Sequence, residues 1–355
     1  MKKIKVAVIG VGGISGEHIN AYLANPNVEL YAFCDINEER LKMKAEKFGI
    51  TRTYTDKDVM LRELPEIDAV SVCTWNSQHA PCTIAALNAG CHVICEKPMA
   101  TSAKEAREMK AAADKNGKLL MIGFVRRFGN DCAIVSDFIK NGYFGDLYYG
   151  KATYLRRNGC PGGWFGDKSR SAGGPLIDLG VHVIDLTRYL CGNPKPVSVY
   201  GVTFDKLKDR PDIKDHGNIG YTSASKTDHD IFDVEDLASA LIRYDNGVVI
   251  SVEASFSLNI KHDEGKIELF GTKAGAKMDP ELEIYTELNG YMSNVQLNRK
   301  TALDFNGLFA NEINHFVDCV MNGTECKAPA EDGITLMEIL DAIYESARTG
   351  HEVIL

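Results

Sequence analysis

The chain has 355 residues, which is long for a single hydrophobic core, so its length predicts two domains. Hydrophobic residues make up 45% and charged residues 25%, the balance of an ordinary globular protein. Forty basic residues against 49 acidic ones leave a net charge of -9, which argues against a nucleic-acid partner because such partners require a basic face. No apolar run approaches the roughly 20 residues of a membrane span, and we expect neither a membrane segment nor a signal peptide.

Ten cysteines are scattered along the chain without a C-x-x-C pair. Several of them, including Cys73, Cys91 and Cys95, lie in apolar segments that resemble strands. Buried free thiols in a reducing cytoplasm explain this distribution better than disulfides or zinc. The sequence therefore predicts a cytoplasmic protein.

The first third of the chain alternates short apolar segments with amphipathic ones. This alternation predicts a doubly wound parallel sheet, a Rossmann domain over residues 1–124. Ser77 and Ser102 are the predicted N-caps of two of its helices. The expected strands are residues 3–10, 28–35, 67–74, 91–98 and 118–124, and the expected helices are residues 14–25, 37–49, 77–90 and 102–117.

After residue 124 the pattern changes. Residues 146–157 alternate in polarity, and Asn246-Gly247 between alternating runs is a strong hairpin signal. Residues 205–231 are polar and predict a surface loop. We expect a second domain, residues 125–355, built on a large open, mostly antiparallel sheet. Its flanking helices are expected at residues 131–142, 176–191, 310–322 and 332–349.

"GVGGIS", residues 10–15, stands between the first strand and the first helix, where a dinucleotide pyrophosphate rests on a helix N-terminus. Gly10 and Gly12 match the dinucleotide-binding pattern, while Ser15 takes the place of its third glycine. Asp35 ends the second strand, where a carboxylate accepts hydrogen bonds from ribose hydroxyls and repels a 2′-phosphate. Asp35 could also be the N-cap of the next helix, and the two roles are compatible. The pattern favours NAD over NADP.

"GGPLIDLGVH", residues 173–182, predicts a helix with Pro175 at its first position, Asp178 and His182 four residues apart, and Asp185 three residues later. One interpretation is an exposed pair at helical spacing, worth about 0.2–0.5 kcal/mol. The other is a proton-transfer site in which Asp178 orients His182. The lysine of "CEKP", residues 95–98, is likewise either a solvated charge at a strand end or a ligand-binding group.

"CTWNSQHAPCTIAALNAGCHVICEKPMA" (73–100), "GGPLIDLGVHVIDL" (173–186) and the glycine turn followed by His18 resemble the Gfo/Idh/MocA family over essentially the whole chain. The resemblance implies an NAD(P)-dependent oxidoreductase that acts on sugars, cyclitols or glycosides. Together with the preference for NAD at Asp35, it leads us to expect an NAD-dependent dehydrogenase that takes hydride from a secondary hydroxyl, such as that at C3, of a sugar, glycoside or cyclitol. It also implies an active site between the two domains. Family members generally pair through the second-domain sheet, so the resemblance implies a homodimer or homotetramer.

Carried over by position, Lys97 contacts the nicotinamide ribose and a substrate hydroxyl, Asp178 and His182 meet the substrate, and Arg127 lines the cleft. Trp164 is either a further substrate contact or an exposed loop aromatic, and His79 is either a cofactor contact or a residue that fills a helix face. His18 is expected to pack or cap. Trp75 stands at a position where members of the family usually have proline. The expected cofactor contacts are Gly10, Gly12, Gly13, Ile14, Asp35, Thr74, Trp75, Asn76, His79, Glu96 and Lys97.

Two other functions use the same residues. In an NAD-dependent glycoside hydrolase, transient oxidation acidifies the neighbouring C–H bond, the aglycone is eliminated, and the hydride is returned. A silent NAD-binding regulator is disfavoured because Lys97, Asp178 and His182 are all present. We expect no metal, because Asp178 and His182 supply too few ligands.

Overall fold

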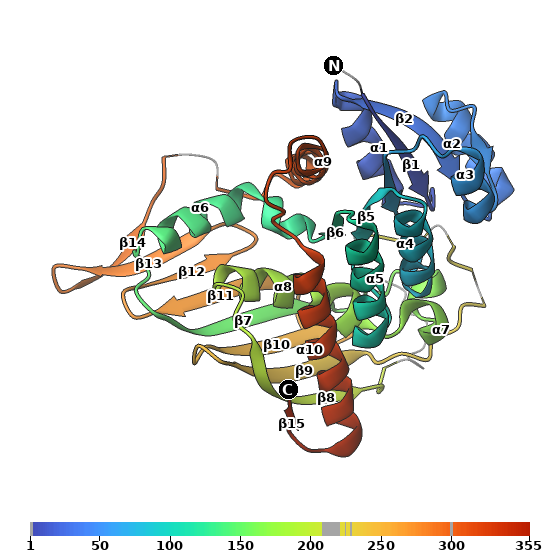
Figure 1. Ribbon diagram of the computed structural model, residues 1–355. Coiled ribbons are helices and arrows are strands. Elements are labelled where there is room, and N and C mark those ends of the chain that lie inside the picture. Colours follow the sequence, from blue (N-terminus) through green and yellow to red (C-terminus); the bar gives the residue numbers. More distant parts are fainter. Residues whose placement is uncertain (1–2, 208–220, 224, 228, 299–300) are drawn as a thin grey trace. The chain divides into compact units, whose positions relative to one another are not determined.

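The computed structural model describes residues 3–207, 221–223, 225–227, 229–298 and 301–355 (Figure 1). The chain divides into two compact units. The first contains Met1–Val125 and Asn306–Met337, and the second contains Arg126–Phe305 and Glu338–Leu355. No helix in the described ranges is long and apolar enough to cross a membrane.

The first unit is built on a parallel sheet of strand order β3-β2-β1-β4-β5-β6. This confirms the predicted doubly wound fold. The short β3 and α3 were not predicted, because their segment is too short and polar to show a period. The strands are β1 (Ile4–Ile9), β2 (Val28–Cys34), β3 (Thr53–Tyr54), β4 (Ala69–Val72), β5 (His92–Glu96) and β6 (Leu120–Gly123), and the helices between them are α1 (Ser15–Ala24), α2 (Glu38–Phe48), α3 (Lys57–Glu63), α4 (His79–Asn88) and α5 (Ala103–Asn116).

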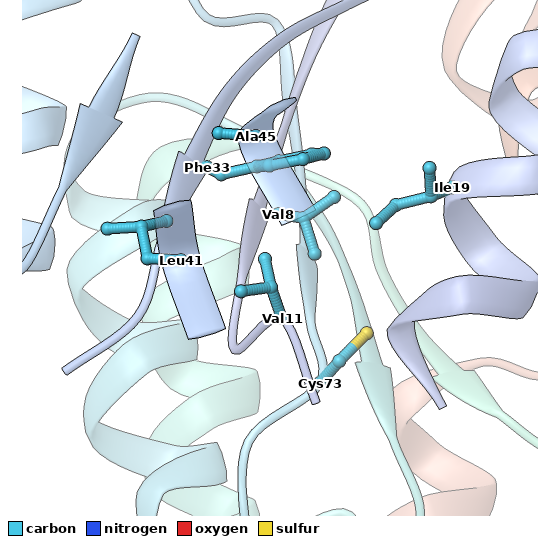
Figure 2. Close-up of a cluster of buried hydrophobic side chains, with 7 residues drawn as sticks. All are labelled: Val8, Val11, Ile19, Phe33, Leu41, Ala45 and Cys73. Carbon is cyan, nitrogen blue, oxygen red and sulfur yellow. The ribbon is translucent and has the colours of Figure 1, made fainter. Parts of the chain in front are cut away.

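A hydrophobic cluster joins the start of this sheet to its first two helices. Phe33 of β2 and Ile19 of α1 are both 0% exposed, and burying a side chain of this size stabilises the fold by about 1.5–3 kcal/mol. Val11 belongs to the same cluster, so the turn that follows β1 is anchored in the core. Figure 2 shows the cluster: Val8, Val11, Ile19, Phe33, Leu41, Ala45 and Cys73.

Side-chain caps were predicted at the start of two of these helices. Ser102 accepts a hydrogen bond from the Glu105 amide at 3.3 Å, which confirms its predicted capping role. The prediction for Ser77 was wrong. Ser77 lies inside a 3₁₀ turn, η1 (Asn76–Gln78), and α4 begins at His79 without a side-chain cap among the described residues. The turn forms because the Gln78 amide donates to the Trp75 carbonyl at 2.9 Å, which moves the helix start beyond the serine.

The chain returns to the first unit near its end. The Ile122 amide of β6 donates to the Ala328 carbonyl at 2.9 Å, and Met121 pairs with Pro329 in an antiparallel bridge. This segment covers the backbone of the edge strand, which otherwise offers unpaired polar groups. Helix α9 (Phe305–Asn322) and the start of α10 (Ala330–Thr349) therefore cluster with the Rossmann sheet, whereas the sequence-based division leaves them in the second domain.

The second unit contains a nine-stranded sheet of described residues in the order β14-β13-β12-β11-β7-β10-β9-β8-β15. Only its β7–β10 pair is parallel, so the predicted mostly antiparallel sheet is confirmed. The strands are β7 (Leu147–Leu155), β8 (Pro196–Phe204), β9 (Leu237–Tyr244), β10 (Val249–Ser255), β11 (Glu264–Gly271), β12 (Ala274–Met278), β13 (Glu283–Leu288), β14 (Tyr291–Val295) and β15 (Val353–Ile354).

Helices of the described residues cover one face of this sheet, and on the other face Tyr200 and Leu241 are exposed. Helix α8 (Val181–Leu190) packs on β7, β10 and β11, and α6 (Asn130–Lys140) packs on α8. The predicted hairpin at Asn246-Gly247 joins β9 to β10, with Gly247 at a φ of 86°. Within the predicted 205–231 loop, residues 208–220, 224 and 228 lie outside the described residues. The remaining ones form neither helix nor strand.

A buried polar cluster ties three elements of the first unit together. His18 of α1 bonds through Nε2 to Glu96 Oε1 of β5 at 2.9 Å, and through Nδ1 to Ser71 Oγ at 3.2 Å. Ser71 Oγ also bonds to the Tyr22 hydroxyl at 2.7 Å. His18 is therefore the centre of a hydrogen-bond network, whereas the sequence analysis expected it to pack or cap.

Glu312 of α9 completes this cluster and is its least satisfied member. It is 0% exposed, and neither carboxyl oxygen has a hydrogen-bond partner among the residues of known placement. Burial and the neighbouring charge of Glu96 raise the pKa of Glu312 well above its ordinary value. Burial alone would also raise the pKa of Glu96, but the hydrogen bond and charge of His18 hold it below its ordinary value. Glu312 therefore carries the proton of the pair.

The Glu312→Gln variant tests this assignment. Because the pKa of Glu312 is higher in the folded state, its contribution to stability is present below about pH 4 and is lost as the pH rises. The glutamine variant has no such titration, so its free energy of unfolding does not fall for this reason as the pH rises. The variant should be as stable as the wild type near pH 4, but more stable by over about 1 kcal/mol at pH 8. Denaturant unfolding at several pH values measures the difference. The exposed Glu29→Gln is the control, and a difference independent of pH would contradict the assignment.

Candidate functional site

The turn after β1 requires glycine at its first position. Gly10 has a φ of +86°, and a Cβ there would lie 2.7 Å from the Cys73 carbonyl oxygen and 2.9 Å from the Thr74 amide nitrogen. A Cβ at Gly12 would meet no protein atom within 4 Å, so the backbone there is open to a ligand. Ser15, in the place of the third glycine, donates its hydroxyl to the Gly12 carbonyl at 2.8 Å and closes the turn.

Two features of this turn fit a bound dinucleotide. Helix α1 starts after Ile14 without a side-chain cap from the described part of the chain, so its first amides remain suited to a pyrophosphate. The Thr74 hydroxyl at the end of β4 is buried without a hydrogen-bond partner in that same part. A cofactor hydroxyl or amide would satisfy it. Gly13 and Ile14 lie in the turn itself, and their contact with the cofactor stays a prediction.

Asp35 is held at the end of β2 by bonds on both carboxylate oxygens. Oδ2 accepts from the Val11 amide at 2.8 Å, and Oδ1 accepts from the Asn37 amide at 2.8 Å and from Arg40 Nη2 at 3.2 Å. Asn37 is the N-cap of α2, which corrects the alternative that Asp35 caps it. The sequence analysis also did not consider Arg40, whose Nε is buried and without a partner among the residues described.

The E-K-P segment follows β5 at the same edge of the sheet. Glu96 accepts a hydrogen bond from the Lys97 amide at 3.2 Å. His79 contacts the Pro98 carbonyl through Nδ1 at 2.6 Å and the Thr74 carbonyl through Nε2 at 3.1 Å, and burial lowers its pKa. His79 thus links two segments, the E-K-P segment and the turn that contains the buried Asn76 and the half-buried Trp75. Neither sequence-based interpretation of His79 included this positioning role.

The glycine pair before the second-unit helix is needed for close packing. A Cβ on Gly173 would collide with the Tyr344 hydroxyl, and one on Gly174 would collide with the Glu235 carbonyl oxygen. The Glu235 carboxylate accepts from the Gly174 amide at 3.0 Å, the Leu176 amide at 3.3 Å and the Tyr344 hydroxyl at 2.9 Å. A carboxylate at this place interacts favourably with the helix dipole and fixes the helix start.

Asp178 and His182 follow directly in this helix, and both are half-buried. Asp178 lies in a π-helical turn, η4 (Leu176–Gly180), and His182 is the second residue of α8. The predicted helix 176–191 is confirmed, but its first turn is π rather than α. Single π turns are frequent at functional sites, because they widen the helix locally.

Arg127 forms a buried ion pair with Asp185 of α8. Its Nε and Nη2 donate to the two carboxylate oxygens at 2.9 and 2.6 Å, and its guanidinium lies 4.6 Å from the centre of the Tyr189 ring. The Arg127 side chain is 0% exposed. This ion pair gives Arg127 and Asp185 a structural role in holding α8, and the expectation that Arg127 lines the substrate cleft stays a prediction.

Trp164 belongs to an aromatic group on the second unit. It stacks on Phe165 with 4.0 Å between the ring centres. Phe165 in turn contacts Tyr221 edge to face, with 6.0 Å between the ring centres. Burial and the negative charge of Asp178 raise the pKa of Tyr221, so this ring lies near Asp178. The sequence analysis missed Phe165 and Tyr221, and Tyr221 falls in a polar segment that carries no periodic signal.

The comparisons with known proteins agree with this geometry. Residues 4–124 match the family model of the oxidoreductase family, NAD-binding Rossmann fold, and residues 137–355 match that of its C-terminal alpha/beta domain. The chain is 36% identical to D-glucoside 3-dehydrogenase of Escherichia coli, over 99% of this chain and 97% of that protein. It is 27% identical to myo-inositol 2-dehydrogenase of Thermotoga maritima, over 76% and 73% respectively.

A solved structure shares the whole architecture. Levoglucosan dehydrogenase in complex with NADH and levoglucosan superposes with a TM-score of 0.85 and 25% identity, over 99% of both chains. The matched family models span both units. The first model is NAD-binding, and three features of the described residues fit this cofactor: the glycine turn, the start of α1 without a side-chain cap, and the Thr74 hydroxyl without a hydrogen-bond partner. The chain therefore belongs to the Gfo/Idh/MocA oxidoreductase family, and its first unit is an NAD-binding Rossmann domain.

Proposed function

We propose that this protein is an NAD-dependent dehydrogenase that oxidises a secondary hydroxyl, such as the one at C3, of a sugar, glycoside or cyclitol. The observation that carries the proposal is the half-buried Asp178 and His182 pair on a helix whose start is fixed by Glu235. The relatives include a glucoside, a levoglucosan and an inositol dehydrogenase, which supports the same class of substrate.

Oxidation of an alcohol releases a hydride and a proton, and NAD⁺ when bound accepts the hydride. We assign the proton to His182, because a free imidazole has a pKa near ~6.5, whereas a free lysine side chain at ~10.4 stays charged. Asp178 orients the imidazole and accepts a substrate hydroxyl. Lys97 polarises the reacting oxygen and holds the nicotinamide ribose.

The aromatic group beside Asp178 suits a carbohydrate substrate. The flat rings of Trp164 and Tyr221 can pack against the C–H face of a pyranose while their N–H and O–H groups reach its hydroxyls. Trp164 is half-buried and Tyr221 is 43% exposed, so both have surface to offer. Both residues are assigned to substrate binding.

Incubation of the full-length protein with NAD⁺ and a panel of free sugars, cyclitols and aryl glycosides tests the reaction class. We expect NADH to accumulate with at least one of these compounds. Release of aglycone without net NADH would instead show a glycoside hydrolase. The absence of any reaction, in a protein that still binds NAD, would indicate a regulator.

Replacement of the catalytic residues should separate chemistry from cofactor binding. His182→Ala and Lys97→Ala should each lower kcat by about 10²–10⁴-fold, the usual effect of losing a positioned acid–base or polarising group. NAD binding should survive in the histidine variant. Steady-state kinetics and NADH fluorescence measure the two effects, and the exposed His262→Ala is the control. Near-normal turnover of His182→Ala across the pH range would reduce Asp178 and His182 to an ordinary helical pair.

The cofactor preference is assigned to Asp35, because its carboxylate repels a 2′-phosphate. We expect NAD(H) to bind at least about 10-fold more tightly than NADP(H), a difference of about 1.4 kcal/mol. Asp35→Ser removes the repulsion and releases Arg40, so it should favour NADP, and adding Arg40→Gln should reverse that gain. Calorimetric titration with both cofactors measures these affinities. Equal or tighter binding of NADP by the wild type would contradict the assignment.

We also propose that the chain forms a homodimer or a dimer of dimers through the open face of its large sheet. On this face Tyr200 of β8 pairs with Leu241 of β9, and the two are 49% and 45% exposed. Burying them against a second copy removes apolar surface from water. Sedimentation velocity should detect a species larger than 39.0 kDa at micromolar concentration, and Leu241→Asp should dissociate it. A wild-type monomer would contradict the proposal.

The state of the cysteines supports a reducing compartment, and we assign the protein to the cytoplasm on that basis. All ten cysteines are free thiols, and most of them are buried. Burial raises the pKa of several, including Cys34 and Cys191 to about 12, so they are protonated and unreactive at neutral pH.

A further inference from the structure

Three metal-ligating side chains meet at the end of α9, outside the dinucleotide and substrate residues. His315 and Cys319 are four residues apart, so they lie on the same face of the helix. Cys326 follows in the connection to α10. One ring nitrogen of His315 and the two cysteine sulfurs all lie within 4.8 Å of one another.

The connection is held in place by its own hydrogen bonds. The Gly323 amide donates to the Cys319 carbonyl at 3.0 Å, and its φ of +69° turns the chain back over the helix. The Asp318 carboxylate accepts from Asn322 Nδ2 at 2.6 Å and from the Thr324 hydroxyl. Cys326 is therefore brought to the other two side chains by backbone and side-chain contacts of this segment.

The distance between the first two ligand atoms matches metal coordination. The Lys327 amide donates to His315 Nε2 at 3.0 Å, so this nitrogen carries a lone pair, and Cys319 Sγ lies 3.4 Å from it. Zinc bonds of about 2.3 Å to sulfur and about 2.0–2.1 Å to nitrogen, at a tetrahedral angle, separate the two atoms by about 3.6 Å. Because Nε2 has a single lone pair, a cation bound there replaces both the thiol proton and the hydrogen bond from the Lys327 amide, which then turns to solvent, while the two ligand atoms already lie near the coordination distance.

We propose that His315, Cys319 and Cys326 form a binding site for a zinc-like cation, with three protein ligands and a fourth position open to water. Two thiolates and an imidazole select zinc or a similarly soft metal over magnesium or calcium, which require oxygen ligands. His315 and Cys326 are only half-buried, so the ion can enter from solvent. No metal was expected from the sequence, because Asp178 and His182 supply too few ligands and these three residues were not considered as ligands.

The place of the site in the fold suggests what the metal does. Two residues after Cys326, the chain pairs with the edge strand β6 through Ala328 and Pro329. A cation that links Cys326 to α9 therefore fastens the returning segment to the Rossmann unit. Because the unfolded chain does not hold the three ligands together, metal binding should stabilise the folded state.

Cobalt(II) is the spectroscopic probe for this site. Titration of the metal-free, reduced full-length protein should give one equivalent of bound cobalt, with thiolate-to-metal charge-transfer bands and the d–d bands of a tetrahedral ion. Zinc should displace it, and binding should release protons from the thiols. Competition with a chromophoric chelator then measures the zinc affinity, and thermal unfolding with and without zinc measures the stabilisation.

The variants identify the ligands. Outer-sphere changes at metal sites cost about 10–100-fold in affinity, so loss of a ligand in Cys326→Ser or His315→Gln should weaken zinc binding by more than about 100-fold. Cys160→Ser and His351→Gln, a half-buried cysteine and an exposed histidine elsewhere, should bind zinc like the wild type. Circular dichroism and NAD titration verify that each variant is folded, independently of any dehydrogenase activity.

Three results would overturn the proposal. The first is a cobalt spectrum without charge-transfer bands, and the second is wild-type zinc affinity in Cys326→Ser. The third is a Cys319–Cys326 disulfide in protein purified without air, because it would assign the two thiols to a redox pair.

Discussion

The buried hydrogen bond between His18 and Glu96, at 2.9 Å, is the interaction on which the cofactor domain most depends. It joins α1, whose N-terminus faces the glycine turn, to the strand end that carries Lys97. The pair also keeps Glu96 ionised although the residue is buried, and the proton of the cluster is left on Glu312. A buried charge in this position is stable only because its partner is equally buried and hydrogen-bonded.

The second unit also contains a carboxylate partly shielded from water, and there most of its hydrogen-bond donors are backbone amides. Glu235 is half-buried and burial raises its pKa, yet two amides at the start of the π turn and the Tyr344 hydroxyl bind its carboxylate. Further along the same helix, the ion pair of Arg127 and Asp185 holds α8. Asp178 and His182 therefore stand on a helix that is fixed on both sides, as catalytic groups require for a constant geometry.

The returning segment Asn306–Met337 gives the Rossmann unit features that a simple nucleotide-binding domain lacks. It covers the edge strand β6, places Glu312 beside Glu96, and carries the cluster of His315, Cys319 and Cys326. Glu312 and His315 are three residues apart on α9, so one stretch of this helix contributes to both the buried network and the cluster of His315, Cys319 and Cys326.

The sequence by itself determined the order of strands and helices, the glycine turn, the cap at Ser102 and the helix that carries Asp178 and His182, because these depend on local periodicity, capping and backbone freedom. Only the tertiary structure decided the partners of distant residues. Arg127 was expected at a substrate and is paired with Asp185, 58 residues away, and His79 positions the E-K-P segment. Glu312, Tyr221 and Arg40 carried no recognisable signal, because a side chain's burial and neighbouring charges arise from contacts that no local pattern encodes.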